Sequence, residues 1–169
     1  MPMSMPEIER SLKTLRLPGI RATLETRSLQ ATQGDLSFLD AFSLLLQDEM
    51  DRRKSRLMER RFAQSGLTER KTLAEFDWGF NPKIPKMACF ELMTLKFLTS
   101  GEDAVLIGAP GTGKSHIAKS VAHAAAVAGY RVLYREAHRL FPEIFEATQL
   151  GTRQKKSRLF AEADLVVID

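Results

Sequence analysis

The fold of this chain is decided by eight consecutive residues, Gly108-Ala109-Pro110-Gly111-Thr112-Gly113-Lys114-Ser115. They match the pattern G-x-x-x-x-G-K-[ST] of a phosphate-binding loop. In such loops glycines let backbone N–H groups turn towards an anion, the lysine reaches the β- and γ-phosphates, and the last hydroxyl binds Mg²⁺. The apolar run 104–107 before the motif predicts a strand, and the alanine-rich run 116–128 after it predicts a helix. The sequence therefore predicts that all eight residues bind the triphosphate of a nucleotide.

A second apolar run, 165–168, predicts a strand that ends in the carboxylate of Asp169. P-loop ATPases place an aspartate that serves Mg²⁺ at the end of such a strand. Asp169 is the last residue of the sequence. A complete ATPase needs further strands, a carboxylate that positions the attacking water and an arginine that acts on the γ-phosphate. We therefore expect the front part of an ATPase, with no residue assigned to catalysis and no ATP turnover.

Composition is that of an ordinary globular protein, with 169 residues, 44% hydrophobic and 27% charged. No apolar stretch approaches the ~18 residues of a membrane span. Residues 1–6 lack the basic and then apolar pattern of a signal peptide, so we expect a cytoplasmic protein without a membrane partner. Cys89 is the single cysteine, which excludes an internal disulfide and a cysteine zinc cluster.

Basic residues are concentrated in two places in a chain whose net charge is +4. Between positions 51 and 71 the sequence has eight cationic and three acidic residues, and a second cluster lies at 153–158. Such patches suit the phosphates of nucleic acid, although a solvated helix face or a contact between subunits is the alternative. The candidate contacts to duplex DNA, without sequence preference, are Arg52, Arg53, Arg56 and Arg60.

Residues 1–72 predict a helical N-terminal domain. Helices are expected near 7–16, up to about 33, and from 38 onwards, the last with Ser37 as its N-cap and Asp40 three residues later. That long helix should fray near 63–66. Its expected core-facing residues, at helical spacing, are Phe38, Phe42, Leu45, Leu46, Met50 and Leu57.

Residues 73–169 predict a partial P-loop domain of α/β class, with the phosphate loop at 108–115 and the aspartate strand at 165–169. A helix is expected over 86–99, a strand over 131–134 after a helix-ending Gly129, and a helix over 137–150 that contains Pro142. Alternating strands and helices imply a parallel sheet with right-handed crossovers. The aromatic segment 76–82 either packs as a hydrophobic plug between the domains or covers an adenine ring.

Several stretches together resemble the IstB-like ATPases, which are helpers of insertion-sequence transposition and belong with the DnaC-type helicase loaders in the AAA+ class. The stretches are 12–19 (LKTLRLPG), 59–61 (ERR), 71–77 (KTLAEFD), 108–118 and 128–133. The phosphate loop occurs in many protein families, whereas the first and third stretches are the ones that point to this particular family.

The resemblance implies that the loop binds ATP and that Ser115 and Asp169 serve Mg²⁺. It implies duplex DNA, a transposase of the same element and further copies of the chain as partners of the full-length protein. It also implies a later strand between 104–107 and 165–169, so we expect this fragment to be only marginally stable. Two alternatives remain: a helicase loader of the same architecture, and a non-enzymatic remnant that still binds DNA or a partner.

Overall fold

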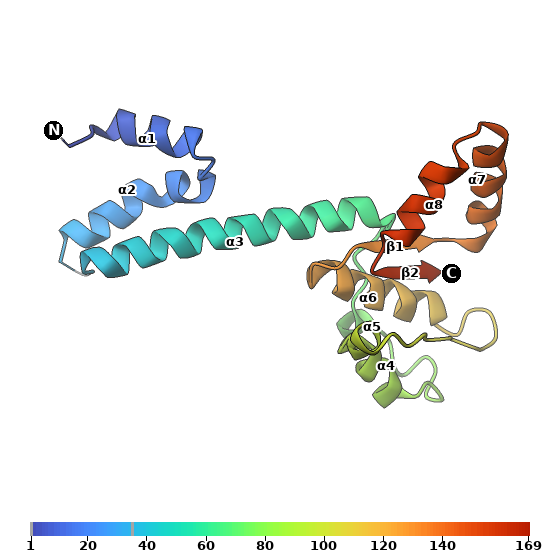
Figure 1. The fold of residues 1–169 in the computed structure, drawn as a ribbon. Helices are drawn as coiled ribbons and strands as arrows, with labels where there is room; N and C mark the ends of the chain where they lie inside the picture. The colour runs from blue at the N-terminus through green and yellow to red at the C-terminus, as the bar shows by residue number, and fades with distance from the viewer. Residues whose placement is uncertain (1, 35) are drawn as a thin grey trace. The chain divides into compact units, whose positions relative to one another are not determined.

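The computed structural model describes residues 2–34 and 36–169, which divide into two compact units (Figure 1). One unit ends at Leu57 and the other runs from Met58 to Asp169, so the division falls inside one long helix. Met1, at which the predicted helical domain begins, lies outside the described residues. No helix in the described part of the chain is both long and apolar enough to cross a membrane.

The first unit contains helices, two of which, α1 and α3, start at side-chain caps, whereas α2 starts at Pro18. The helices are α1 (Met5–Thr14), α2 (Pro18–Thr32) and α3 (Phe38–Ser65), the last continuing into the second unit. In front of α1, the main-chain N–H and hydroxyl of Ser4 donate to the Glu7 carboxylate at 2.8 and 2.7 Å. The predicted cap of α3 is confirmed, because the Ser37 hydroxyl donates to Asp40 at 2.6 Å and accepts from its N–H at 3.2 Å.

Helices α2 and α3 meet at a buried carboxylate. Glu49 is 4% exposed and accepts hydrogen bonds from the N–H groups of Gly19 at 2.6 Å and Ile20 at 3.3 Å. Arg53 Nε donates to the same carboxylate at 2.7 Å. Burial opposes ionisation, but these hydrogen bonds outweigh it and hold the pKa of Glu49 below its ordinary value. A Cβ on Gly19 would lie 2.5 Å from the Cα of Glu49, so only glycine allows this approach.

The apolar face predicted along α3 is not buried in the first unit, and the prediction is wrong for four residues. Phe38, Phe42, Leu46 and Met50 are 78, 47, 43 and 63% exposed, whereas Leu45 and Leu57 are half-buried. The reason is that α2 contacts α3 through Asp48 and Glu49, with Arg27 paired to Asp48 at 3.0 Å. The exposed four, spaced four residues apart, form a stripe on another face of the helix.

The second unit is built around α6, whose small residues allow close packing. Its elements after α3 are η1 (Leu73–Glu75), α4 (Lys86–Met93), α5 (Lys96–Ser100), α6 (Lys114–Val127), β1 (Val132–Arg135), α7 (Ala137–Gln149), α8 (Arg153–Ala161) and β2 (Leu165–Ile168). Ala122, Ala125 and Ala126 are fully buried in the core of this unit. Because alanine has a short side chain, α6 packs closely on α4, on η1 and on both strands. Figure 1 shows α6 between α4 and the two strands.

The predicted parallel pairing is confirmed for β1 and β2. Val132 lies opposite Leu165 and Arg135 opposite Ile168, and α7 and α8 form the crossover between the strands. Helix α8 was not predicted; its residues 153–158 appeared in the sequence only as a basic cluster. Two of these cations are paired, Lys156 with Glu143 at 2.6 Å and Arg158 with Glu162 at 2.5 Å.

Residues 104–107, predicted as the strand before the phosphate loop, form no strand in the described structure. The sheet of the described residues contains β1 and β2 alone, so this segment has no hydrogen-bonded neighbour. Val105 and Ile107 are consequently 79% and 92% exposed. The apolar run has strand-forming composition but lacks the pairing that defines a strand.

Two of the predicted helices differ in detail. The helix predicted over 86–99 is divided into α4 and α5, because Leu95 has a left-handed φ of 59° while its side chain is buried. Pro142 lies inside α7 beyond its first turn and cannot donate to the carbonyl of His138.

The predicted end of the helix that follows the loop is confirmed at Gly129. Its φ is 96°, and the N–H groups of Gly129 and Tyr130 donate to the carbonyls of Ala126 and Ala125 at 3.1 and 3.0 Å. This pair of bonds is the Schellman arrangement, which ends α6 and directs the chain into β1.

Candidate nucleotide-binding site

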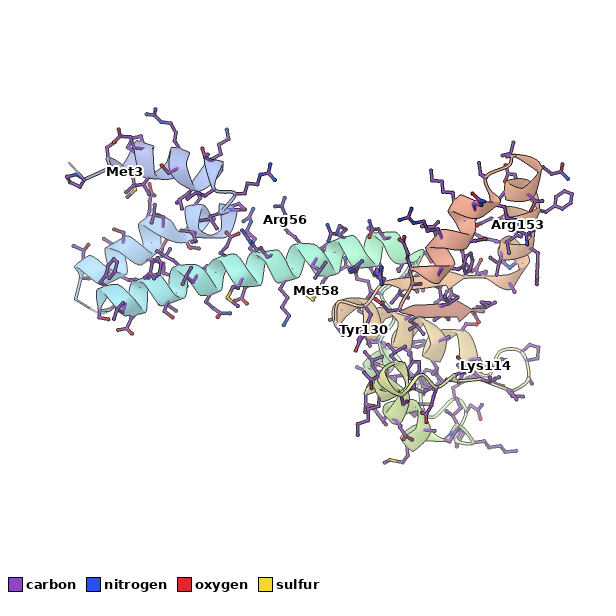
Figure 2. All side chains as sticks on the ribbon, in the orientation of Figure 1. Met3, Arg56, Met58, Lys114, Tyr130 and Arg153 are labelled. Atoms are coloured by element: carbon purple, nitrogen blue, oxygen red, sulfur yellow. The ribbon has the colours of Figure 1, made fainter. Side chains whose placement is uncertain are left out.

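The loop 108–115 leads directly into the N-terminus of α6. Gly111 and Gly113 have φ values of 74° and 93°, in the left-handed region that glycine alone adopts easily. Gly113 is the N-cap of α6, so Lys114 and Ser115 are the first two residues of the helix. Figure 2 shows Lys114 at this end of α6. The geometry is that of a loop that can hold an anion against a helix N-terminus.

Gly113 also lies against an aromatic ring from the preceding segment. A Cβ at Gly113 would lie 2.7 Å from Cζ of Phe76, which is buried. Phe76 contacts the His116 ring edge to face at 5.1 Å, and Nε2 of His116 lies 2.9 Å from the carbonyl oxygen of Thr72. The segment around η1 therefore supports the loop and the first turn of α6 from one side.

The aromatic segment 76–82 does not behave as one unit. Phe76 packs in the core of the second unit, and its ring lies 4.7 Å from that of Trp78. Phe80 is 70% exposed. Phe76 is therefore a support for the loop glycine within the second unit.

Two polar side chains of the loop, those of Lys114 and Thr112, donate to the same carbonyl. Lys114 Nζ and Thr112 Oγ1 both donate to the carbonyl oxygen of Ala109 at 2.8 Å. A Cβ on Gly108 would lie 3.2 Å from Thr112 Oγ1, so the loop closes tightly at its start. A phosphate group offers Lys114 a charged acceptor in place of this neutral carbonyl, which makes the stronger hydrogen bond.

Ser115 and Asp169, the two predicted Mg²⁺ residues, are in direct contact. The Ser115 hydroxyl donates to Oδ1 of Asp169 at 2.8 Å, although 54 residues separate them in the sequence. The main chain of Asp169 continues the pairing of β2, since its N–H donates to the carbonyl of Arg135 at 3.0 Å. Its own carbonyl accepts from the N–H of Ala137 at 2.7 Å. Asp169 is thus fixed by the sheet at the loop.

Tyr134 is a site residue that the sequence did not reveal. It lies on β1, is 4% exposed, and donates from its hydroxyl to Oδ2 of Asp169 at 2.5 Å. Burial, and then this bond to a carboxylate, raise the pKa of Tyr134 well above its ordinary value. One carboxylate oxygen of Asp169 therefore meets Ser115 and the other meets Tyr134. A tyrosine in a strand that is expected to be buried needs a hydrogen-bond partner for its hydroxyl, and this requirement was the sequence signal that could have identified Tyr134.

The oxygen atoms at this point fit Mg²⁺, which prefers hard oxygen ligands and usually takes only one or two from the protein. The hydroxyl of Ser115 and the carboxylate of Asp169 supply them next to a loop with the shape for phosphates. These two residues could hold the metal together with the phosphates of a nucleotide and water.

A hollow of about 790 Å³ adjoins the loop, at Gly108, Thr112 and Lys114. Its other walls come mainly from residues 81–85, from α4 and α5, and from the segment 102–107.

The four arginines predicted to touch DNA are divided between the units. Arg52, Arg53 and Arg56 lie in the first unit and Arg60 in the second. Arg53 is engaged by Glu49. In the part of the chain that the structure describes, the side chains of Arg52, Arg56 and Arg60 have no acceptor.

A glycine-rich loop, the helix that follows it and a strand-terminal aspartate in contact with the loop serine define a P-loop nucleotide-binding protein. The family model of the IstB-like ATP-binding proteins matches residues 10–169. The chain belongs to this family.

Proteins similar in sequence to this chain are named as ATP-binding proteins of insertion sequences. One from Mycobacterium tuberculosis is 34% identical over 139 residues, which is 82% of this chain and 55% of the relative. The IS21 protein of Pseudomonas aeruginosa is 32% identical over 98% of this chain and 62% of its own length. The IS5376 protein of Geobacillus stearothermophilus is 30% identical over 92% of this chain and 62% of its own. The chain thus spans less than two thirds of these relatives.

Proposed function

We propose that this protein is an ATP-binding helper of DNA transposition. It binds ATP and Mg²⁺ at the loop 108–115, assembles on target DNA with further copies of itself, and acts with the transposase of the same insertion sequence. The hydrogen bond of 2.8 Å between Ser115 and Asp169 carries the nucleotide part, because it brings two oxygen ligands suited to Mg²⁺ together at a phosphate-type loop. The names of the relatives support the transposition part.

Each residue of the loop has a distinct role in this proposal. Gly108, Gly111 and Gly113 let the backbone of Ala109, Pro110 and Thr112 curve around the phosphates. Lys114 leaves the carbonyl of Ala109 and binds the β- and γ-phosphates. Ser115 binds Mg²⁺, and Asp169 holds the metal with an orientation fixed by Tyr134. Bound Mg²⁺ neutralises phosphate charge.

The proposal concerns ATP binding and not turnover. No residue of the chain is assigned to activate the attacking water, and Lys114, Ser115 and Asp169 serve binding. DNA binding is assigned to the basic residues Arg52, Arg53, Arg56 and Arg60, which offer charge without an arrangement for reading base edges.

The test is equilibrium binding of a fluorescent ATP analogue to the purified chain. Lys114→Ala removes a charge-assisted contact worth roughly 1.5–3 kcal/mol, so affinity should fall at least about tenfold while the far-UV spectrum is unchanged. Lys155→Ala on α8 is the matched control, because Lys155 is an exposed lysine outside the loop. Equal affinity of wild type and Lys114→Ala would show that the loop is not the nucleotide site.

A further inference from the structure

A second, basic pocket opens in the first unit, where the connection between α1 and α2 meets α3. Its volume is about 520 Å³, and Leu12, Leu17 and Pro18 contribute apolar wall. Figure 2 shows Arg56 projecting from α3 on the side of this connection. The pocket contains one carboxylate, Glu49, and six cationic residues: Lys13, Arg16, Arg21, Arg52, Arg53 and Arg56.

Among the described residues, the charge of this pocket is not balanced by acidic groups. Glu49 is already bonded by the N–H groups of Gly19 and Ile20 and by Arg53. Within residues 2–34 and 36–169, the other five cationic side chains of the pocket have neither an acidic partner nor a hydrogen-bond acceptor. Cations gathered within a Debye length of about 8–10 Å repel one another, so their collection in one pocket favours an anionic ligand.

Arg16 stands in a backbone conformation that favours glycine. Its φ is 57°, and it occupies the position after the cap of α1, where its N–H donates to Lys13 and that of Leu17 donates to Leu12, at 3.1 and 2.9 Å. Glycine is the usual residue at this position of a Schellman motif, because a Cβ disfavours the left-handed region. The main chain thus gains nothing from arginine, whereas the side chain adds a charge to the pocket.

We propose that this pocket binds phosphates of the duplex DNA backbone, and that Lys13, Arg16 and Arg21 form the site together with the arginines of α3. The inference rests on the proposed function, in which the protein assembles on DNA. It adds residues from α1, from α2 and from the turn between them to the basic run of α3. Five cations without a partner among the described residues, from three helices and the turn between the first two, exceed what one phosphate requires and suit successive phosphates of a strand. Since Glu49 occupies the first amides of α2, side chains make the contacts.

The experiment measures binding of the full chain to a labelled duplex of arbitrary sequence, by fluorescence anisotropy over a series of salt concentrations, with and without ATP. The pocket variants are Arg16→Gly and the double variant Arg21→Gln with Arg52→Gln. The control is the double variant Arg10→Gln with Lys54→Gln, which removes the same charge from exposed positions on α1 and α3 outside the pocket. Thermal unfolding is recorded for all variants, and tripolyphosphate serves as a competitor.

We expect the pocket double variant to lose at least about tenfold in affinity at low salt and to lower the slope of log affinity against log salt by about 2, because two phosphate contacts are lost. Arg16→Gly should lower the slope by about 1 and melt no lower than wild type, which separates binding from folding. The control should keep the wild-type slope.

Equal losses of DNA affinity in the pocket variants and in the control would contradict the proposal that the pocket binds DNA. The proposal that the protein binds DNA would still stand. Competition by tripolyphosphate as effective as that by duplex DNA, at equal phosphate concentration, would assign the pocket to a small polyphosphate and overturn the DNA proposal. If the wild type binds no DNA in either nucleotide condition, the DNA part of the proposed function fails as well.

Discussion

The hydroxyl of Ser115 and the carboxylate of Asp169 are joined by a hydrogen bond of 2.8 Å between the first turn of α6 and the end of β2. This contact makes one site of two motifs that lie far apart in the sequence. It depends on the sheet, because β2 pairs with β1 in a register that carries Asp169 one residue beyond the last pair. The geometry of the site therefore depends on the pairing of these two strands.

Replacing Asp169 with Asn should weaken ATP binding only when Mg²⁺ is present. The amide oxygen can still accept from Ser115, but the charge that attracts the metal is removed. We expect affinity in Mg²⁺ to fall about tenfold, which is about 1.4 kcal/mol, and affinity in EDTA to stay within about twofold. The measurement is titration of an ATP analogue in both buffers. An equal loss in the two buffers would mean that Asp169 does not serve the metal.

Replacing Tyr134 with Phe should destabilise the protein and loosen Asp169. The variant keeps the buried ring and removes a hydroxyl whose partner is a carboxylate, so we expect a loss of about 1–2 kcal/mol in the free energy of unfolding. Urea unfolding at pH 7 measures it. Tyr130→Phe is the control, because Tyr130 is also a tyrosine of the second unit and donates no side-chain hydrogen bond within the described residues. Equal stability of Tyr134→Phe and wild type would contradict the role of Tyr134 in positioning Asp169.

Local patterns were sufficient to predict much of the second unit. The turns at Gly111, Gly113 and Gly129 have positive φ values, which glycine adopts most easily, so these residues were a reliable local signal. The runs that form β1 and β2 are short, rich in strand-forming residues and followed by charged residues. The run 104–107 has the same composition and forms no strand, because pairing depends on neighbours that composition does not encode.

Contacts between distant residues were the part that the sequence could not predict. Helical spacing along α3 identified an apolar stripe, but the helix packs through Asp48 and Glu49 instead, where Gly19 permits close approach. In the sequence, Tyr134 is an ordinary strand residue, and only the structure shows that its hydroxyl contacts Asp169. Both features depend on which surfaces of the elements pack against each other. Periodicity shows which residues share one face of an element but not which face is buried.

Replacing Glu49 with Gln should lower stability at neutral pH and have less effect in acid. The pKa of Glu49 is held below its ordinary value of 4.5, so its ionised form stabilises the fold above about pH 4.5. That contribution is lost as pH falls through the lowered pKa. We expect a loss of about 1.5–3 kcal/mol at pH 7, because two amides and Arg53 lose a charged acceptor, and a clearly smaller loss near pH 3.

The measurement for Glu49 is urea unfolding followed by far-UV circular dichroism at both pH values. Glu25→Gln is the control, since Glu25 is an exposed glutamate on α2. The same loss at pH 7 and pH 3 would contradict a role for the ionised carboxylate.

The support of the loop by Phe76 can be tested with two glycines that share a backbone conformation but differ in surroundings. Gly111 and Gly113 both have positive φ, so alanine at either position costs about 1–2 kcal/mol from the backbone. An added Cβ at Gly111 meets nothing within 4 Å, whereas at Gly113 it lies 2.7 Å from the ring of Phe76. Gly113→Ala should therefore destabilise by at least about 1 kcal/mol more than Gly111→Ala, as overpacking does. Adding Phe76→Leu to each variant should relieve only the second, so a coupling energy near zero between positions 76 and 113 in urea unfolding would contradict the contact.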